Sequence, residues 1–570
     1  MRKIYSLVLM ATMLLIGANV KAQVATVSIN GGAAAPLATS SALTDALLGL
    51  ADGAAAVFTL NDDVALGDAQ DVTGSKWFDG GKSITFNLNN HQIDCYIRFN
   101  LKHASLYIVG PGVVDMKIAN IFAATYGSKV KDEPYGYSTL TIGEGVTINS
   151  ANQYALGIFP RDYADATYTG SNTKCNGTME QDDWKVKYGA GAGVTINING
   201  TVTSKYGVSS NGQLAATVGN VPVINVGANA HINTSDYNGI YAGGYAIWNI
   251  KGEVTGLTGV YAKAGVFNLD GATITGTGEY EKPTTNNNGT SGGGSGIVLD
   301  GNNAYAGEME LHVTGNTVVT STEGAAVEEL VTSANESETK ALEIQSGTFN
   351  GSVQLGSLTL TAELGQDVQI NGTITGGTYN SDISEYLSPS GKAVEPVDDG
   401  NGHIVYQVVE GRVATLNAQG LATFSCHEYN VVLPVGLEAY KATVVGTDEV
   451  TFERIAVGDG EKVLPVDAGF VLKGNEGSYS LPKSTASAIT VSGNLLKPST
   501  EWAAGYKNNA YILHGGELWI YNGDSFKDDK AFLPISGGTG APKRISFRYD
   551  APTSVENVEA TIKSSNKEKI

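Results

Sequence analysis

Short segments of alternating apolar and polar residues recur along most of the chain, and each ends in a turn rich in glycine or asparagine. Examples are LTIGEGVTI from Leu140, VINVGANAHI from Val223, IWNIKGEVTG from Ile247 and LEIQSGTFNG from Leu342. A two-residue period indicates strands with one buried face, whereas a helix requires a period near 3.6 residues. Repetition about every 20 to 30 residues indicates a solenoid, in which one structural unit stacks on the next.

This pattern predicts a parallel β-helix over residues 23–410. Helical solenoids are excluded because the 3.6-residue period is absent, and leucine-rich repeats because their regular leucine and asparagine positions are absent. In a β-helix the apolar residues of each coil stack on those of the next coil. Glycine and asparagine form the corners, where the backbone needs positive φ angles.

The segment from Ala246 to Gly276 makes the prediction specific. We expect its inward-facing side chains to be Ile247, Ile250, Val254, Val260, Phe267, Leu269 and Ile274. We expect its corners at Gly252, Gly256, Gly271 and Gly276. The charged residues that we expect on the solvated exterior of the coils are Lys251, Glu253, Lys263 and Asp270.

One segment, SSALTDALLGLADG from Ser40, has the periodicity of an amphipathic helix instead. Its apolar face consists of Leu43, Ala46, Leu47 and Leu50. We expect a helix over residues 40–52, with Ser41 as its N-cap and Gly53 as its stop. A single helix at the start of a solenoid would cover the open end of the strands, where unpaired backbone groups would otherwise invite further pairing.

The pattern changes after residue 410. Residues 411–552 contain short alternating segments between turns, such as VLPVDAGFVLKG from Val463, which predict an antiparallel β-sandwich. Residues 553–570 are polar and charged without a pattern, and we expect them to be disordered.

Both ends of the predicted β-helix resemble a known family. TDALLGLADGAAAVFTLNDDVAL followed by SITFNLNNHQI is similar to the beginning of right-handed parallel β-helix surface proteins of the pectin-lyase-like superfamily. ITGGTYNSDISEYLSPSGKAVEPVDDGNGHIVYQV is similar to the final segment of the same proteins. The family's DLNGH-like turn is Asn87–His91 here, with asparagine in place of both Asp and Gly. The resemblance implies a right-handed coil with an N-terminal capping helix. The C-terminal strands are similar to a domain common in secreted and surface proteins of the Bacteroidetes.

The N-terminus has the composition of a secretory signal peptide. Arg2 and Lys3 precede an apolar run from Leu7 to Ile16, and small residues precede Gln23. We expect cleavage before Gln23, so that residues 1–22 are removed and the protein is secreted or reaches the cell surface. The apolar run is shorter than the roughly 20 residues of a membrane-spanning helix, so we expect no transmembrane segment. A lipoprotein is not expected because the residue after the cleavage site is not cysteine.

The chain is acidic, with 36 basic and 57 acidic residues and a net charge of −21. Such a surface repels nucleic acid and anionic membranes, so neither is an expected partner. The cysteines, Cys95, Cys175 and Cys426, are too few for a disulfide framework and too far apart for a CxxC metal motif. We expect them to be buried or incidental thiols.

The long insertion at residues 159–190 is the strongest candidate for a functional site. Its candidates for catalysis are Asp162, Asp182, Asp183 and Lys185. Its candidates for ligand binding are Arg161, Tyr163, Tyr168 and Trp184, of which the aromatic residues suit stacking on sugar rings. Long loops on a solenoid commonly form its binding face. The alternative is a solvated loop without a role in binding.

A second candidate is DYNGIYAGGYAIW, from Asp236. Its Tyr241 and Tyr245 fit a ligand-binding surface, but their spacing also fits packing inside or at a corner of the coils. No two histidines are close enough in sequence to suggest a metal pair. Asp270 and Asp300 leave Ca²⁺ as an alternative, but turn formation is favoured because the GGxGxD repeat is missing. We therefore expect no metal site and no cofactor.

The enzymes that share the predicted fold have motifs that this chain lacks. There is no RIK-like stretch, no GHG, no paired Asp in an NTD-like strand and no RxPxxR. We therefore expect a non-enzymatic, adhesin-like surface protein that binds a carbohydrate or a host or cell-surface protein. Two alternatives stay open: a polysaccharide lyase or glycoside hydrolase with an atypical site, and a structural surface-layer or matrix component. The fold does not decide among them, since one scaffold hosts unrelated functions.

Overall fold

The structure is a computed structural model with two compact units. It describes residues 23–550 except 71–74, 102, 118–120, 125–137, 152–153, 160–193, 211–221, 285–289, 291, 301–308, 331–338, 357–371, 388–390, 447–448 and 536–541. The solenoid unit comprises the chain up to Tyr386 together with Pro396–Gln407. The C-terminal unit comprises Leu387–Glu395 and the chain from Val408 onward.

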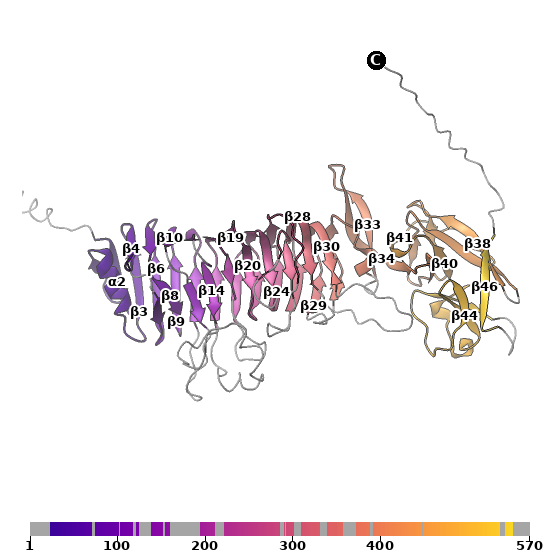
Figure 1. Ribbon diagram of the computed structural model, residues 1–570, viewed down its shortest axis with the longest axis horizontal. Coiled ribbons are helices and arrows are strands. Elements are labelled where there is room, and N and C mark those ends of the chain that lie inside the picture. Colours follow the sequence, from indigo (N-terminus) through magenta and orange to yellow (C-terminus); the bar gives the residue numbers. More distant parts are fainter. Residues whose placement is uncertain are drawn as a thin grey trace, which may run out of the picture. The chain divides into compact units, whose positions relative to one another are not determined.

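The solenoid unit is a parallel β-helix, as the sequence predicts (Figure 1). Each strand pairs in parallel with the corresponding strand of the coil before and the coil after. For example, β21 (Ile247–Ile250) pairs with β18 (Val223–Val226) on one side and with β24 (Gly265–Asp270) on the other. Most coils contribute three strands, so three sheets run along the unit.

Sheet 1 consists, in order, of β2 (Ala35–Leu37), β1 (Ala25–Ile29), β3 (Ala55–Leu60), β6 (Lys82–Asn87), β9 (Ala104–Val109), β12 (Ser138–Ile142), β15 (Val194–Ile198), β18 (Val223–Val226), β21 (Ile247–Ile250), β24 (Gly265–Asp270), β27 (Met309–Thr314), β29 (Thr339–Ile344) and β31 (Gly372–Ile374). Sheet 2 consists of β4 (Val64–Leu66), β7 (Gln92–Cys95), β10 (Gly112–Met116), β13 (Val146–Ser150), β16 (Thr201–Ser204), β19 (His231–Thr234), β22 (Glu253–Gly256), β25 (Thr273–Gly276), the first halves of β28 (Val318–Glu329) and β30 (Thr348–Leu355), and β32 (Thr378–Tyr379). Sheet 3 consists of β5 (Ser75–Phe78), β8 (Arg98–Leu101), β11 (Ile121–Ala124), β14 (Leu156–Phe159), β17 (Val208–Ser209), β20 (Asn238–Ala242), β23 (Thr258–Ala262), β26 (Ile297–Leu299) and the second halves of β28 and β30.

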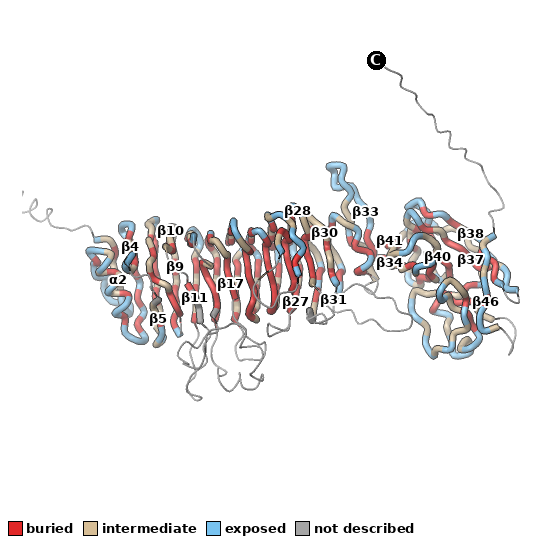
Figure 2. The backbone as a smooth tube through the Cα atoms, in the orientation of Figure 1, coloured by how far each residue is buried: buried red, intermediate tan, exposed pale blue. Residues whose placement is uncertain are grey.

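Inward side chains form stacks that run from coil to coil, and Figure 2 shows buried residues throughout the coils of the unit. Of the expected inward set in Ala246–Gly276, all are buried except Ile247, which is half-exposed. The expectation for Ile247 was wrong because the adjacent Trp248 takes the inward position. Trp248 is fully buried and stacks on Phe267 of the next coil, with ring centroids 6.1 Å apart and ring planes 5° apart.

The corner between sheets 2 and 3 is formed by glycines in successive coils. A Cβ atom on Gly259 would lie 2.6 Å from the Gly296 carbonyl oxygen and 2.6 Å from Ile274 Cγ2. Gly239 in the preceding coil is equally confined, with the Gly259 carbonyl oxygen 2.8 Å from its would-be Cβ. Only glycine therefore fits these corners without displacing the neighbouring coil. Of the predicted corner glycines, Gly252 and Gly271 lie in turns, whereas Gly256 and Gly276 end β22 and β25 and pair with each other.

The helix α2 (Ser40–Leu48) covers the first strand of sheet 2. The Ser40 and Thr44 side-chain oxygens accept hydrogen bonds from the backbone N–H groups of Ala65 and Gly67, at 3.1 Å each. These bonds pair donors that would otherwise remain open at the end of the sheet, as expected of a capping helix. The expected helix ends differ. Thr39 is the N-cap instead of Ser41, and Gly49 is the C-cap instead of Gly53.

Antiparallel strands close the other ends. At the N-terminal side of sheet 1, β1 pairs antiparallel with β3, and β2 with β1. At the C-terminal side of sheet 2, β32 pairs antiparallel with the beginning of β34 (Ile404–Leu416). The short 3₁₀ helix η3 (Ser384–Tyr386) and β33 (Lys392–Asp398) lie between them in the sequence. Antiparallel pairing interrupts the parallel coil at both ends, which prevents further coils from adding.

The C-terminal unit is a β-sandwich with an additional core. Its strand pairs are antiparallel, except that β38 (Glu449–Val457) pairs in parallel with β46 (Arg544–Tyr549). One layer contains β34, β41 (Gly477–Ser484), β36 (Asn430–Val432) and β39 (Val463–Leu464), and the second layer contains β35 (Leu421–Phe424), β40 (Phe470–Lys473), β37 (Glu438–Val445) and β38. The first core packs between these two layers. A second core packs on the opposite face of the second layer. Neighbouring residues on one strand, such as Ala439 and Tyr440, belong to different cores. The strands are β35 (Leu421–Phe424), β36 (Asn430–Val432), β37 (Glu438–Val445), β38 (Glu449–Val457), β39 (Val463–Leu464), β40 (Phe470–Lys473), β41 (Gly477–Ser484), β42 (Lys497–Pro498), β43 (Ala510–His514), β44 (Glu517–Ile520), β45 (Ala531–Pro534) and β46 (Arg544–Tyr549), with 3₁₀ helices η4 (Ser499–Glu501) and η5 (Ala504–Tyr506).

Candidate functional site

The outer face of sheet 3 differs from those of sheets 1 and 2. In sheet 1, β9 and β27 alternate buried and half-buried residues. In the central part of sheet 3, every residue of β20, β23 and β26 is buried, so both faces of the sheet are covered there. Outward-facing side chains there are held in a water-poor environment, where polar interactions are stronger than on an open sheet.

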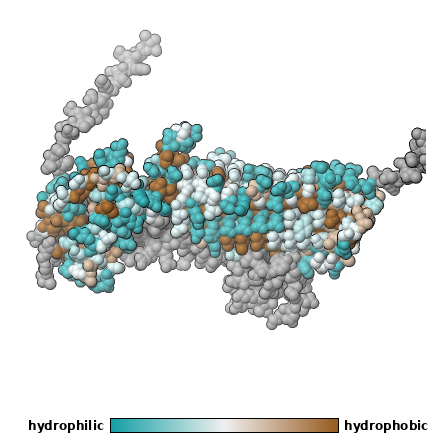
Figure 3. All heavy atoms as spheres, turned by 180° about the vertical axis from the view of Figure 1, so that it is seen from behind, coloured by the Kyte–Doolittle hydropathy of each residue, from teal (hydrophilic) through white to brown (hydrophobic). Residues whose placement is uncertain are grey.

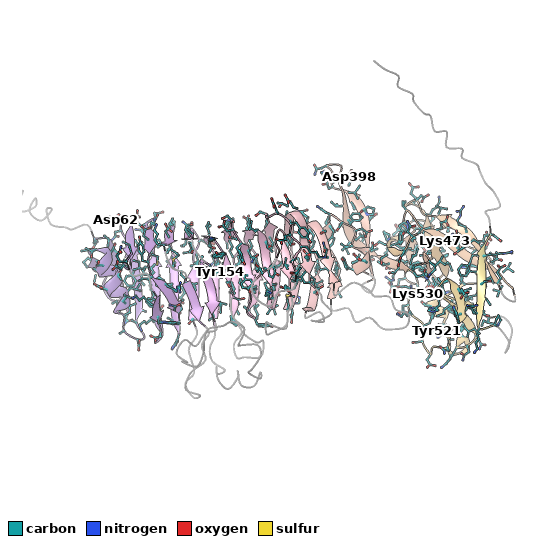
Figure 4. The ribbon with its side chains drawn as sticks, in the orientation of Figure 1. Asp62, Tyr154, Asp398, Lys473, Tyr521 and Lys530 are labelled. Atoms are coloured by element: carbon teal, nitrogen blue, oxygen red, sulfur yellow. The ribbon has the colours of Figure 1, made fainter. Side chains whose placement is uncertain are left out.

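A cluster of four tyrosines lies where the chain enters sheet 3. Tyr154 and Tyr206 each precede their strand by two residues, in adjacent coils whose residues Leu156 and Val208 are paired. Their ring centroids are 5.5 Å apart, and those of Tyr206 and Tyr237 are 5.2 Å apart. We refer to Tyr154, Tyr206, Tyr237 and Tyr241 as the tyrosine cluster. Figure 4 shows Tyr154 on the side of the solenoid that faces the viewer.

The tyrosine cluster consists of one buried ring, which lies beneath three half-exposed rings. Tyr241 is only 4% exposed and packs against Tyr154, with centroids 6.4 Å apart. The other three rings are half-exposed. Lys205 Nζ lies 5.4 Å from the Tyr206 centroid and 4.0 Å from Asp236 Oδ2. Flat apolar rings bordered by a cation and a carboxylate suit a ligand with both apolar faces and hydroxyl groups.

Next to the tyrosine cluster, sheet 3 contains a buried ion pair. Lys263 Nζ lies 2.8 Å from Asp300 Oδ2, and the Tyr261 hydroxyl donates to the same oxygen at 2.9 Å. Both charged side chains have 0% exposure. The expectation that Lys263 lies on the solvated exterior was therefore wrong, because a carboxylate from the neighbouring coil makes its burial tolerable. Lys251, Glu253 and Asp270 are exposed, as expected.

A second buried carboxyl group lies on the same outer face of sheet 3, in the row that contains Tyr261 and Val298. Glu328 is 1% exposed and accepts hydrogen bonds from the hydroxyls of Tyr280, at 3.2 Å, and Ser295, at 3.1 Å. Burial raises the pKa of Glu328, while the two hydroxyls and the charge of Lys282 lower it by less. A carboxyl group with a raised pKa stays protonated, and therefore neutral, to a higher pH than an ordinary carboxyl group.

The residues predicted from the long insertion lie outside the described residues. These are Arg161, Asp162, Tyr163, Tyr168, Asp182, Asp183, Trp184 and Lys185. Of the two tyrosines predicted elsewhere, Tyr241 lies at the base of the tyrosine cluster and Tyr245 is half-buried in the turn before β21. Sequence reasoning missed Tyr154 and Tyr206. A tyrosine shortly before an apolar strand in successive coils, in QYALGI, KYGVSS and DYNGIYA, was the signal that could have found them.

The remaining reactive, charged and aromatic side chains that could form a site are buried or contact other residues of the protein. Cys95 and Cys426 are buried free thiols, and burial raises the pKa of Cys95 to about 12, so it is unreactive near neutral pH. In the C-terminal unit, Arg412 is 9% exposed and contacts Asp529 and Glu428, each at 2.9 Å. Figure 4 labels Tyr521, one of several aromatic residues that pack around Trp502, with centroids 5.4 Å apart.

Within the described parts of the chain, no group of three or more His, Cys, Asp or Glu side chains could hold a metal ion. None of the described helices is long and apolar enough to cross a membrane. Comparison with known protein families, with characterised proteins and with solved structures found no match to this chain. The geometry of the site therefore carries the functional argument.

Proposed function

We propose that this is an exported, non-enzymatic surface protein that binds a glycan through the tyrosine cluster. The observation that carries the proposal is the set of three half-exposed rings, Tyr154, Tyr206 and Tyr237, held side by side on a rigid solenoid. Tyrosine rings offer a large contact area at low entropic cost, and their hydroxyls add hydrogen bonds. Because backbone pairing between coils fixes the spacing of the rings, little ordering would be needed on binding.

The sequence resemblance supports this role. The similarity to right-handed, pectin-lyase-like surface proteins and to a Bacteroidetes C-terminal domain fits a protein displayed outside the cell, and the signal-peptide pattern at residues 1–22 fits export. The insertion at residues 159–190 begins directly after β14, the strand that follows Tyr154. Its aromatic residues are therefore candidates to extend the same binding face.

The test is a binding screen of the purified chain against a panel of plant and host polysaccharides, with products followed to detect turnover. We expect binding without turnover, and a loss of affinity of about tenfold or more in Tyr206→Ala, since buried or half-buried aromatic residues often dominate binding energy. The control is Tyr107→Ala, which removes a half-exposed tyrosine from the outer face of sheet 1.

Other outcomes separate the alternatives. Turnover of a polysaccharide that persists in Tyr206→Ala would favour an enzyme with its site elsewhere. Binding that both variants weaken equally, or neither, would exclude the tyrosine cluster as the ligand site. Assembly of the chain into sheets without glycan binding would favour a structural surface-layer role.

A further inference from the structure

A buried lysine and a buried aspartate face each other across two neighbouring coils of sheet 3. Lys263 directly follows β23 and Asp300 directly follows β26, and these two strands pair in parallel. Nζ of Lys263 lies 2.8 Å from Oδ2 of Asp300, and both side chains have 0% exposure. The carboxyl carbon therefore lies one bond beyond an oxygen that the amine already contacts.

Exclusion of water changes the chemistry of this pair. Burial lowers the pKa of Lys263, and the carboxylate of Asp300 opposes the change only in part. A desolvated lysine releases its proton more readily, and the neutral amine that results is a nucleophile. Transfer of the proton within the pair leaves an amine beside a carboxylic acid, which are the two reactants of amide formation. Fixed contact between reactants removes much of the entropic barrier to such a step.

The solenoid contains a matched pair that lacks this environment. Lys251 Nζ lies 2.9 Å from Asp270 Oδ2, again between two neighbouring coils, because β21 pairs with β24. These side chains are 56% and 53% exposed. Water stabilises both charges there, and an ammonium group has no lone pair with which to attack. The two pairs thus have the same groups and nearly the same distance but opposite burial.

We propose that Lys263 and Asp300 form an intramolecular amide bond that links two coils of the solenoid covalently. The Nζ lone pair attacks Cγ of the protonated carboxyl, and the Tyr261 hydroxyl stabilises the negative charge that develops on Oδ2. The bond from Cγ to the other carboxyl oxygen then breaks. That oxygen leaves as water, with the acid proton and one proton from the amine. The step needs no oxidant and no further reactant.

The bond would link the two coils that directly follow the tyrosine cluster. Tyr261, which contacts Asp300, is paired with Tyr241 of the cluster in the adjacent coil. A covalent link between coils resists separation along the solenoid axis, which an ion pair resists only weakly once water enters. The inference concerns the scaffold and does not depend on the identity of the ligand.

The decisive experiment uses the full chain without any substitution. The purified protein is unfolded, its free amines are acetylated, and the peptides from digestion are analysed by mass spectrometry. We expect a branched peptide that contains Lys263 and Asp300 and is one water lighter than the sum of its parts, with no acetyl group on Lys263. Lys251 is the internal control, and we expect it to be acetylated. Recovery of Lys263 acetylated and Asp300 in a separate linear peptide would overturn the proposal.

Two variants and one control variant test the proposed roles. In Lys263→Met the branched peptide must disappear, whereas in Lys251→Met it must persist. Tyr261→Phe keeps the ring in place, so the unit should fold, and we expect a reduced or slower-forming cross-linked fraction in freshly purified protein. An unchanged fraction in Tyr261→Phe at the earliest time point would contradict the role of the hydroxyl, and a branched peptide in Lys263→Met would contradict the assignment of the bond.

Discussion

The outer faces of sheet 1 and sheet 3 come from the same coils, yet they have different surroundings. The outer face of sheet 1 carries a ladder of asparagine amides, in which Asn225 donates to Asn197 at 2.8 Å and Asn249 donates to Asn225 at 2.9 Å. Beside it lies a row of half-exposed aliphatic side chains that includes Ile247. Figure 3 shows a hydrophilic band next to a shorter hydrophobic one, as these two rows predict.

The central part of the outer face of sheet 3 is covered and contains the buried ion pair and Glu328. The half-exposed rings of the tyrosine cluster lie beside it, where the chain enters the sheet. The two sheets share the same backbone pairing between coils, and coverage of the central part of sheet 3 creates the chemically distinct part of the scaffold. An open row of amides gains little from each side chain, because water competes for the same hydrogen bonds. In a covered row, a polar group with a hydrogen-bond partner stabilises the fold strongly, and a polar group without one destabilises it strongly.

Removal of one partner of the buried ion pair should have the largest effect. Asp300→Ala removes the carboxyl group that Lys263 needs both as its charge partner and for the proposed amide bond, and it should lower the free energy of unfolding by about 3–5 kcal/mol. Lys251→Ala, which breaks the exposed pair with Asp270, should change it by about 0–1 kcal/mol. Urea unfolding measures both. Equal effects of the two substitutions would remove the energetic distinction between the faces.

A side chain at the glycine corner should have the next largest effect. Gly259→Ala places a Cβ 2.6 Å from the Gly296 carbonyl oxygen, which forces the coils apart and should cost about 1–3 kcal/mol. Gly293→Ala is the control, because its nearest neighbour, Thr258 Oγ1, would lie 3.8 Å from the new Cβ. A stable Gly259→Ala protein would show that the corner can widen and that close approach of the coils is not required.

The asparagine ladder should contribute less. Asn225→Ala removes two amide hydrogen bonds, from Asn249 and to Asn197, and should cost about 1 kcal/mol because the half-buried amides of the neighbours regain hydrogen bonds from water. Thr203→Ala, an exposed position on sheet 2, should have an effect near zero. A loss of unfolding free energy for Asn225→Ala as large as that for Asp300→Ala would mean that the side chains on the outer face of sheet 1 contribute as much to stability as the buried pair of sheet 3.

The smallest effect concerns pH. Because burial raises the pKa of Glu328, the folded protein keeps a proton that the unfolded chain loses, and stability falls as pH rises from the ordinary value of 4.5 through the raised value. Glu328→Gln stays neutral, so it should gain stability relative to the parent over that interval and match it at lower pH. Glu253→Gln, at an exposed position of sheet 2, provides the control. Thermal unfolding across pH measures the difference, and parallel profiles for the parent and Glu328→Gln would contradict it.

Most of the scaffold could be predicted from the sequence because its causes are local. Alternation of apolar residues and the glycine turns are readable within each segment, and they predicted buried positions such as Val254 and Phe267. The prediction for Ile247 was wrong because IWNI has apolar residues at both odd and even positions. Only the alignment of Trp248 with Phe267 shows which of these positions faces inward.

The candidate site was harder to predict because its contacts join distant segments. Lys263 reads locally as a charged residue in a turn, and its burial depends on Asp300, 37 residues later. The tyrosine cluster likewise brings together residues from different coils, separated by insertions of unequal length. Tyr154 and Tyr206 share a position two residues before their strands, but their separation along the chain does not show that these strands are neighbours, with rings 5.5 Å apart.

The central proposal is that a glycan binds at the tyrosine cluster. Chemical labelling of tyrosines, with and without a glycan identified in the screen, tests it most directly. We predict that Tyr154, Tyr206 and Tyr237 become protected from nitration when the glycan is bound, while Tyr107 on sheet 1 is labelled equally in both samples. Protection of Tyr107, or of Tyr521 in the C-terminal unit, with the tyrosine cluster unchanged would contradict the claim.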